Sequence, residues 1–376
     1  MFKKSLAAVA VLGAFAGTAL AADVQLYGIV DYGFQYAETD AGINGEKATH
    51  TFEMKDGINS ASRFGLKGVE DLGNGYKVGF VLENGFHADD GTLNDGKRLF
   101  DREAHLYVAS EYGQLGFGRL GVLASGNGSY GLFGSAVSPI STGWGDILGH
   151  KAVMAAGFDR LDNSVVYKSP KFAGFNVLAQ YSFKKDSKAE YVGEAREGSA
   201  EVDRQYAFGT TYNAGNLNLV GIVTKTNVAS ASTEKYDSKD PMTVSLGGNY
   251  DFGVAKLFVA TQYFKDSKLA VEAFQEDQRK VYDGYGLQVG ANVPAFGGTA
   301  KVLVGYMDAE HQNEVGADAY DMSRVNFAVG YEYPLSKRTL VYTGAGYCQD
   351  SYDRKIADAD DSAHKWAASA GIVHKF

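Results

Sequence analysis

The chain has 376 residues and a formal charge of −9, and it contains 47 Gly, 24 Tyr and 22 Phe but only 5 Pro. The net negative charge argues against nucleic acid as a partner, and the single cysteine, Cys348, excludes an intramolecular disulfide and a Cys-based metal site. No segment after residue 22 supplies the roughly 18 consecutive apolar residues that a membrane helix needs. Two classes remain: a large soluble β protein, or a transmembrane barrel in which apolar and polar residues alternate.

Residues 1–21 have the pattern of a secretory signal peptide. Lys3 and Lys4 precede an apolar run over residues 6–20, and the small-residue pattern at residues 19–21 is typical of a cleavage site. We expect cleavage before Ala22, so that residues 22–376 form the exported barrel. Loss of the two lysines would take the formal charge from −9 to −11.

From Val24 onward, apolar residues recur at every second position, as in strands with one face in lipid and one in water. In the first strand, one face carries Leu26, Gly28, Val30, Tyr32 and Phe34, and the other carries Gln25, Tyr27, Asp31 and Gln35. Residues 242–250 and 325–333 repeat this pattern. A soluble sandwich would alternate too, but here the polar face is small and uncharged over long runs. Aromatic residues also gather at strand ends, like an interfacial girdle.

The links between the predicted strands alternate between short and long. Short links are expected at 70–75, 111–113, 170–174, 214–216, 252–253, 294–298 and 334–337. Long polar links are expected at 38–50, 87–98, 184–203, 227–240, 266–282, 308–322 and 349–363. Outer-membrane barrels have short periplasmic turns and long outer loops, whereas a soluble sandwich has no reason to keep this order. The pattern predicts an all-β antiparallel barrel of about 16 strands, enough to enclose a water channel. The first and last strands must then pair, because lipid cannot satisfy open edges.

Residues 120–158 form the longest link and differ from the others. They are rich in Gly, Ser and Ala, and their charges are limited to Asp146, Lys151 and, when protonated, His150. A structureless loop of this length is uncommon unless it is functional. We predict that it folds into the barrel and narrows the lumen. The alternative is a disordered surface loop. Apolar residues such as Phe133 and Trp144 argue against it, because disordered segments are poor in such residues.

Five motifs spread over nearly the whole exported chain resemble the general porin family of Gram-negative outer membranes, most closely its β-proteobacterial branch. They are Val24-Gln-Leu-Tyr-Gly28, the segment 62–68 followed by Glu70-Asp-Leu-Gly73, Phe117-Gly-Arg-Leu120, the segment 160–165, and His374-Lys-Phe376. The resemblance implies a 16-stranded trimeric barrel whose third outer loop folds inward to form an eyelet. It also implies that Phe376 is an outer-membrane assembly signal.

Charged residues predict a basic wall in the lumen. If Phe64 and Leu66 face lipid, Arg63 and Lys67 must face the lumen. Periodicity leaves the side of Arg102 open, but the resemblance places it on the inner wall. The resemblance also implies a wall arginine at Arg160. Three weaker candidates complete the set, which we call the basic wall: Arg63, Arg102, Arg160, Lys67, Arg119 and Lys168. On the loop side, Asp146 is the one central carboxylate, with Asp159 and Asp162 near the return of the loop.

The expected function is passive diffusion of ions and small hydrophilic solutes across the outer membrane. Wall cations outnumber loop carboxylates, so a mild anion preference is expected, unless the arginines only brace the loop. Outer-membrane lipid, lipopolysaccharide and two further copies in a homotrimer are the expected partners. The alternatives are a channel for one anionic or sugar-like solute, and a plugged structural or adhesive barrel. No enzyme, cofactor or metal site is expected, because the sequence shows neither a nucleophile elbow nor metal-ligand spacing among its seven histidines.

Overall fold

The structure is a computed structural model that describes residues 23–43, 45–126, 128–140, 144, 147–155, 157–191, 195–229, 239–274, 281–311, 320–353 and 361–376. No helix in these ranges is long and apolar enough to cross a membrane. The helical elements in them are two short 3₁₀ turns, η1 (Gly134–Ala136) and η2 (His150–Val153).

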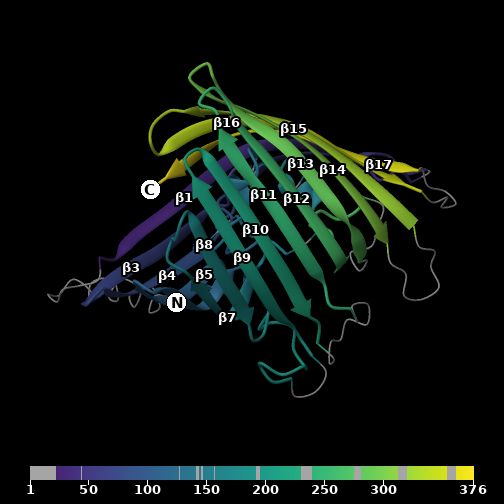
Figure 1. Cartoon of the computed structure of the whole chain (residues 1–376). Coiled ribbons are helices and arrows are strands. Elements are labelled where there is room, and N and C mark those ends of the chain that lie inside the picture. The colour runs from purple at the N-terminus through teal and green to yellow at the C-terminus, as the bar shows by residue number, and fades with distance from the viewer. Residues whose placement is uncertain are drawn as a thin grey trace, which may run out of the picture.

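The described residues form seventeen strand segments in one antiparallel sheet (Figure 1). They are β1 (Gln25–Asp40), β2 (Thr49–Asp56), β3 (Arg63–Gly73), β4 (Tyr76–Gly85), β5 (Glu103–Ser110), β6 (Gly113–Gly121), β7 (Arg160–Lys168), β8 (Phe175–Ser182), β9 (Arg204–Ala214), β10 (Leu217–Asn227), β11 (Met242–Asp251), β12 (Lys256–Ser267), β13 (Tyr282–Ala295), β14 (Gly298–His311), β15 (Tyr320–Pro334), β16 (Thr339–Tyr352) and β17 (Ser362–Lys375). The predicted alternation of short and long links is confirmed by these bounds.

The sheet closes because β1 pairs with β17, from Ile29 opposite Lys375 to Asp40 opposite His364. Beyond the end of β17, the backbone N–H and C=O of Phe376 exchange two 3.1 Å hydrogen bonds with Gly28. The Phe376 ring lies where a side chain on Gly28 would otherwise stand. The predicted pairing of the first and last strands is therefore confirmed.

The segments β2 and β3 together make one interrupted strand, so the barrel has sixteen strands. β2 pairs with residues 32–39 of β1, and β3 pairs with residues 25–29. Residues 57–62 leave the ladder between them, and the buried Asp31 carboxylate accepts hydrogen bonds from the backbone N–H groups of Asn59 and Ser60 at 2.6 and 2.7 Å. The predicted strand number is confirmed, whereas the interruption was not predicted.

The two faces of the wall differ as the alternation predicts. Leu26 on β1 is 64% exposed on the outer face, while Asp31 on the inner face is fully buried. Exposed aromatic side chains gather near the short links, at Tyr112, Tyr167, Phe172, Tyr250, Phe252, Phe296 and Tyr333. This distribution matches the aromatic girdle of a barrel standing in a bilayer.

The long link between β6 and β7 covers residues 122–159, which we call the inserted loop. It starts two residues later than expected, because Leu120 and Gly121 belong to β6. Its apolar side chains lie against inward-facing glycines of the wall, in the pairs Leu132 with Gly209, Val137 with Gly247, Pro139 with Gly290, Trp144 with Gly344, Leu148 with Gly346, and Val153 with Gly305. The inserted loop therefore lies inside the barrel.

The approach is tightest at Gly286, where an added Cβ would stand 1.6 Å from the carbonyl oxygen of Val153. We predict that Gly286→Ala displaces η2 and lowers the unfolding midpoint in detergent by several degrees, because overpacking of this kind costs about 1–3 kcal/mol. Thermal unfolding followed by circular dichroism measures the change. Gly96→Ala is the matched control, since an added Cβ there meets open space. Equal midpoints for the two variants would contradict the close packing.

Candidate pore constriction

The inserted loop contacts the wall over a wide arc. At its start, Ser129 contacts Glu103 of β5, and further along Trp144 packs edge-on against Tyr342 of β16. The backbone N–H of Trp144 also donates to the carbonyl of Ile58, in the interruption between β2 and β3. By contrast, the inward side chains of β3 and β4 bond mainly to one another and to the start of β5. The wall around β3 and β4 therefore faces the inserted loop across the lumen.

Arg63 and Lys67 lie on the inner face of β3. Arg63 stands opposite Ile29, and Lys67 opposite Gln25, on the same face as Tyr27. The Lys67 ammonium lies 5.2 Å from the centre of the Tyr27 ring. Arg63 Nε lies 3.6 Å from Glu83 Oε2 on β4. The structure thus places both side chains where alternation predicts.

Arg102 shares sequence parity with Leu106, which is 48% exposed on the outer face. Arg102 nevertheless points inward, because it precedes β5 and the chain turns there. Its backbone N–H donates to the Glu83 carbonyl at 3.2 Å, and its Nε donates to Glu83 Oε1 at 2.6 Å. Tyr27 Oη donates to the second oxygen of the same carboxylate at 3.0 Å. Glu83 is therefore shared by Arg63, Arg102 and Tyr27, and the sequence analysis missed it.

Glu103, directly opposite Glu83 in the ladder, places a carboxylate on the wall rather than on the loop. Its two oxygens accept hydrogen bonds from the backbone N–H and the hydroxyl of Ser129, at 2.8 and 2.9 Å. The expected loop carboxylate, Asp146, lies outside the described residues. The contact that the structure describes at this point therefore runs from an acidic wall residue to a neutral loop residue.

Arg119 braces the outer mouth of the barrel. The register of β6 against β7 shifts between Gly118 and Leu120, so Arg119 leaves the regular alternation. Its Nη1 lies 2.5 Å from Asp162 Oδ1, and its Nε donates to the Asp101 carbonyl at 2.6 Å. Arg98, which the sequence analysis did not single out, lies 2.5 Å from the other oxygen of Asp162.

Two outer-loop carboxylates extend this network. Asp186 accepts a hydrogen bond from Arg98 at 2.8 Å, and Asp95 accepts one from Lys188 at 2.6 Å. Partial burial alone would raise the pKa of Asp186. Its hydrogen bonds to Arg98 and to the backbone N–H of Lys188, together with the positive charges of both side chains, outweigh this, and the pKa is lowered. The Lys188 hydrogen bond likewise lowers the pKa of Asp95 well below its usual range. Both carboxylates are therefore ionised at neutral pH.

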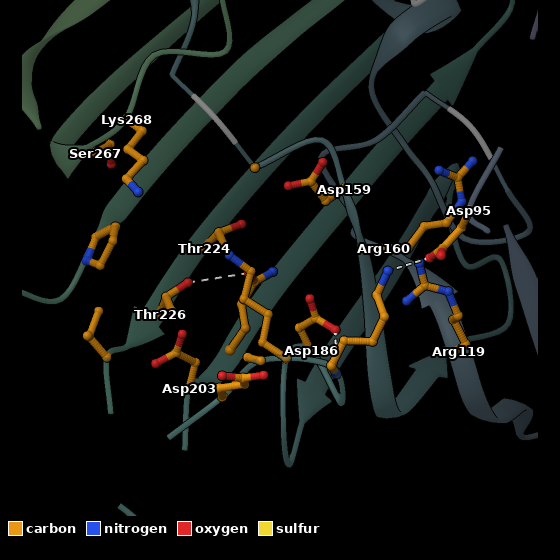
Figure 2. A pocket seen from close by; sticks show the side chains of 18 of the residues that line it. Asp95, Arg119, Asp159, Arg160, Asp186, Asp203, Thr224, Thr226, Ser267 and Lys268 are labelled. Carbon is orange, nitrogen blue, oxygen red and sulfur yellow. Dashed lines mark hydrogen bonds and ion pairs between the residues drawn. The ribbon is translucent and has the colours of Figure 1, made fainter. Parts of the chain in front are cut away.

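A cavity of about 950 Å³ opens above the return of the inserted loop, at the long-link end of the barrel. Figure 2 shows Arg119 and Arg160 on one side of this cavity and Ser267 and Lys268 on the other. Asp101 and Glu83 act electrostatically on Arg160, but no described carboxylate forms an ion pair with it.

A second cavity, of about 440 Å³, lies on the short-turn side of the inserted loop. Its lining includes Leu132 and Ala136 of the loop and Lys168, Asn176 and Asn218 of the wall. The basic wall is therefore not one ring. Arg63 and Arg102 surround Glu83, Arg119 and Arg160 line the outer cavity, Lys168 lines the inner one, and Lys67 lies nearer the short turns.

The structure also brings together Asp56, His87 and Asp89, whose possible ligand atoms lie within 4.8 Å of one another. Their sequence spacing does not suggest a cluster. His87 Nδ1 lies 3.3 Å from Asp56 Oδ1. This contact joins the end of β2 to the link after β4, next to the interruption of the wall. It gives Asp56 and His87 a structural role as an ion pair.

Comparison with known proteins assigns the family. The family profile described as Gram-negative porin matches residues 7–353. An outer membrane porin protein of Bordetella pertussis is 32% identical and is covered in full, as is this chain. Outer membrane porin protein 32 of Delftia acidovorans is 31% identical, over 93% of this chain and 90% of the relative.

Among solved structures, the anion-selective porin from Comamonas acidovorans superposes with a TM-score of 0.65 and 23% identity. The match covers 94% of this chain and 100% of that one. The closed sixteen-stranded barrel, its inserted loop and these similarities agree. The chain belongs to the Gram-negative porin family and is a diffusion channel of the outer membrane.

Proposed function

We propose that this porin passes ions and small hydrophilic solutes passively, with a mild preference for anions set by the basic wall. The proposal rests on one observation: the six cations of the basic wall outnumber the described carboxylates that pair with them. Arg63 and Arg102 share the single carboxylate of Glu83. Arg119 shares Asp162 with Arg98.

Three members of the basic wall have no ion pair with a described carboxylate. Lys67 contacts the face of Tyr27, while Arg160 and Lys168 line the two cavities on either side of the inserted loop. The described lining of the inner cavity carries Lys168 and Lys256 and no carboxylate, whereas the outer cavity carries cations and carboxylates in nearly equal number. Surplus positive charge beside low-dielectric walls attracts anions and repels cations. The sign agrees with that of the anion-selective porin from Comamonas acidovorans.

Bracing and selectivity are divided between different arginines in this proposal. Arg102 is 5% exposed and hydrogen-bonded at 2.6 Å, so its main role is to hold Glu83 in place. Arg119 has a similar role at Asp162. The residues that act on passing ions are then Arg63, Arg160, Lys67 and Lys168. Phe376, which seals the first strand to the last, is the proposed assembly signal.

Neutralising the unpaired cations tests the charge assignment. We predict that Arg160→Gln and Lys168→Gln each lower the chloride-to-potassium permeability ratio roughly two- to fivefold, which corresponds to about 0.4–1 kcal/mol for a partly screened charge. Reversal potentials across a planar bilayer under a KCl gradient give the ratio. Lys337→Gln, in the exposed turn between β15 and β16, is the control and should change nothing. Clear cation preference in the unmodified protein that persists in Asp146→Asn would reject the proposal.

Removing the shared carboxylate should act in the opposite direction. Glu83→Gln leaves Arg63 and Arg102 without their counter-charge, so we expect the permeability ratio to rise. Breaking a buried pair in this way costs about 3–5 kcal/mol, so the folded fraction must first be checked by heat-dependent mobility in gel electrophoresis. Glu70→Gln, an exposed carboxylate on the same β3–β4 hairpin, is the control. A fall in the ratio for folded Glu83→Gln would contradict the assignment.

We further propose that three copies associate through the outer face of β1, β2 and β17. An apolar depression there is lined by Phe34, Met54 and Ile372. The link after β4 lies beside it: Asp89 also lines the depression, and the Ala88 carbonyl accepts a hydrogen bond from the Tyr32 hydroxyl. The resemblance to trimeric porins supports the number three. Light scattering of the detergent-solubilised protein is expected to give the mass of three chains. A mass of one chain would refute the trimer and leave the channel proposal intact.

A further inference from the structure

A second segment enters the lumen beside the inserted loop. Residues 268–274, in the link between β12 and β13, form what we call the companion segment. Leu269 makes an isolated antiparallel bridge with Ala155 of the inserted loop, and the N–H of Ala270 donates to the Met154 carbonyl at 2.9 Å. Leu269, Val271 and Ala273 are buried in the same apolar cluster as η2. The companion segment and the second half of the inserted loop are therefore packed as one unit.

Arg324 joins this unit to the wall. It lies on β15 directly opposite Asp350 of β16, and both side chains are fully buried. Its Nε and Nη2 bond to the two Asp350 oxygens at 2.5 and 2.9 Å. Its Nη1 donates to the Ala152 carbonyl of η2 at 3.0 Å. The companion segment contributes two further acceptors, the carbonyls of Val271 and Glu272, at 2.7 and 2.9 Å.

All five N–H groups of the guanidinium are used, on three different parts of the chain. A guanidinium presents five donors in a rigid fork, whereas a lysine ammonium has three donors on a flexible stem. Asp350 is equally occupied, because it also accepts the N–H of Phe274 and the hydroxyl of Tyr352, each at 3.0 Å. Both residues are fully buried and line neither the outer nor the inner cavity, so Arg324 does not meet passing ions directly.

We propose that Arg324 is a positioning residue of the constriction: by holding η2 and the companion segment against β15 and β16, it sets the width and steadiness of the passage. This inference rests on the channel function. The lumen-facing cations of the basic wall would decide which ions pass. Arg324 would decide how far the inserted loop stands from the wall around β3 and β4.

Single-channel recording of the full chain tests the proposal. For Arg324→Gln we expect conductance to rise by about a tenth to a half, with larger open-channel fluctuations, because pore width governs conduction. Arg324→Lys, which keeps the charge beside Asp350 but lacks two donors, should fall between this variant and the unmodified protein. Arg338→Gln, at an exposed turn residue, is the control and should leave the recording unchanged.

A cross-link separates positioning from general loss of structure. Residues paired across an antiparallel bridge have Cα atoms within disulfide reach, so Ala155→Cys with Leu269→Cys, in a Cys348→Ala background, can tie the two segments covalently. Because Leu269 lies two residues beyond the end of β12, this disulfide holds the inserted loop to the wall without Arg324. Added to Arg324→Gln, the oxidised pair should restore the conductance and quiet recording of the Cys348→Ala parent. The reduced pair should not.

Heat-dependent gel mobility shows which variants fold. If Arg324→Gln does not fold, Arg324→Lys replaces it. Lysine has two donors fewer than arginine and cannot hold all three parts of the chain, so it should raise conductance and fluctuation in the same way. Unchanged recordings from folded Arg324→Gln, or from Arg324→Lys in its place, would overturn the positioning role while leaving the channel function standing. Absence of conductance in the unmodified protein would overturn both.

Discussion

The hydrocarbon core of a bilayer offers backbone N–H and C=O groups no hydrogen-bond partner, so every strand of this protein needs a neighbour on each side. The pairing of β1 with β17 meets that requirement by closing the sheet. The break in the wall at residues 57–62 is tolerated because Asp31 supplies an acceptor for the freed N–H groups of Asn59 and Ser60. Closure fixes the circumference, and everything inside must fit within it.

The interior is divided by close packing between the inserted loop and the wall. At Gly286 and Gly344 the loop can approach the wall closely because the wall residue has no Cβ. Loop carbonyls are satisfied by inward polar groups such as Gln288, which donates to Val137 at 3.1 Å, and Arg324. The loop contacts β5 through Ser129 and Glu103, and it packs along the arc from β9 to β16. In the proposed channel, solute passes beside Arg63, Arg102 and Arg160, and the charges there set its selectivity.

Alternation and link length were enough to predict the fold from the sequence, because both follow directly from a wall with one face in lipid. They also predicted the inner-face position of Arg63 and Lys67. They did not predict the break at residues 57–62. Gly57, Asn59 and Ser60 are local turn signals, but they fall between the expected links 38–50 and 70–75, where the pattern predicts a single strand. Partners on neighbouring strands and on distant links were also missed. Alternation assigns a side chain to a face, but it does not say that Glu83 would be shared by Arg63 and Arg102, or that Arg324 would reach carbonyls of two separate links. The same limit left Arg102 ambiguous, since its position depends on where β5 starts.

The account claims that anions follow the basic wall past the inserted loop. A crystal of the protein soaked in bromide tests this directly, because the anomalous signal of bromide locates bound anions. The account predicts bromide peaks between the inserted loop and the wall from β3 to β7, beside Arg63 and Arg160. Peaks confined to the arc from β9 to β16, or a loop lying outside the barrel, would contradict it.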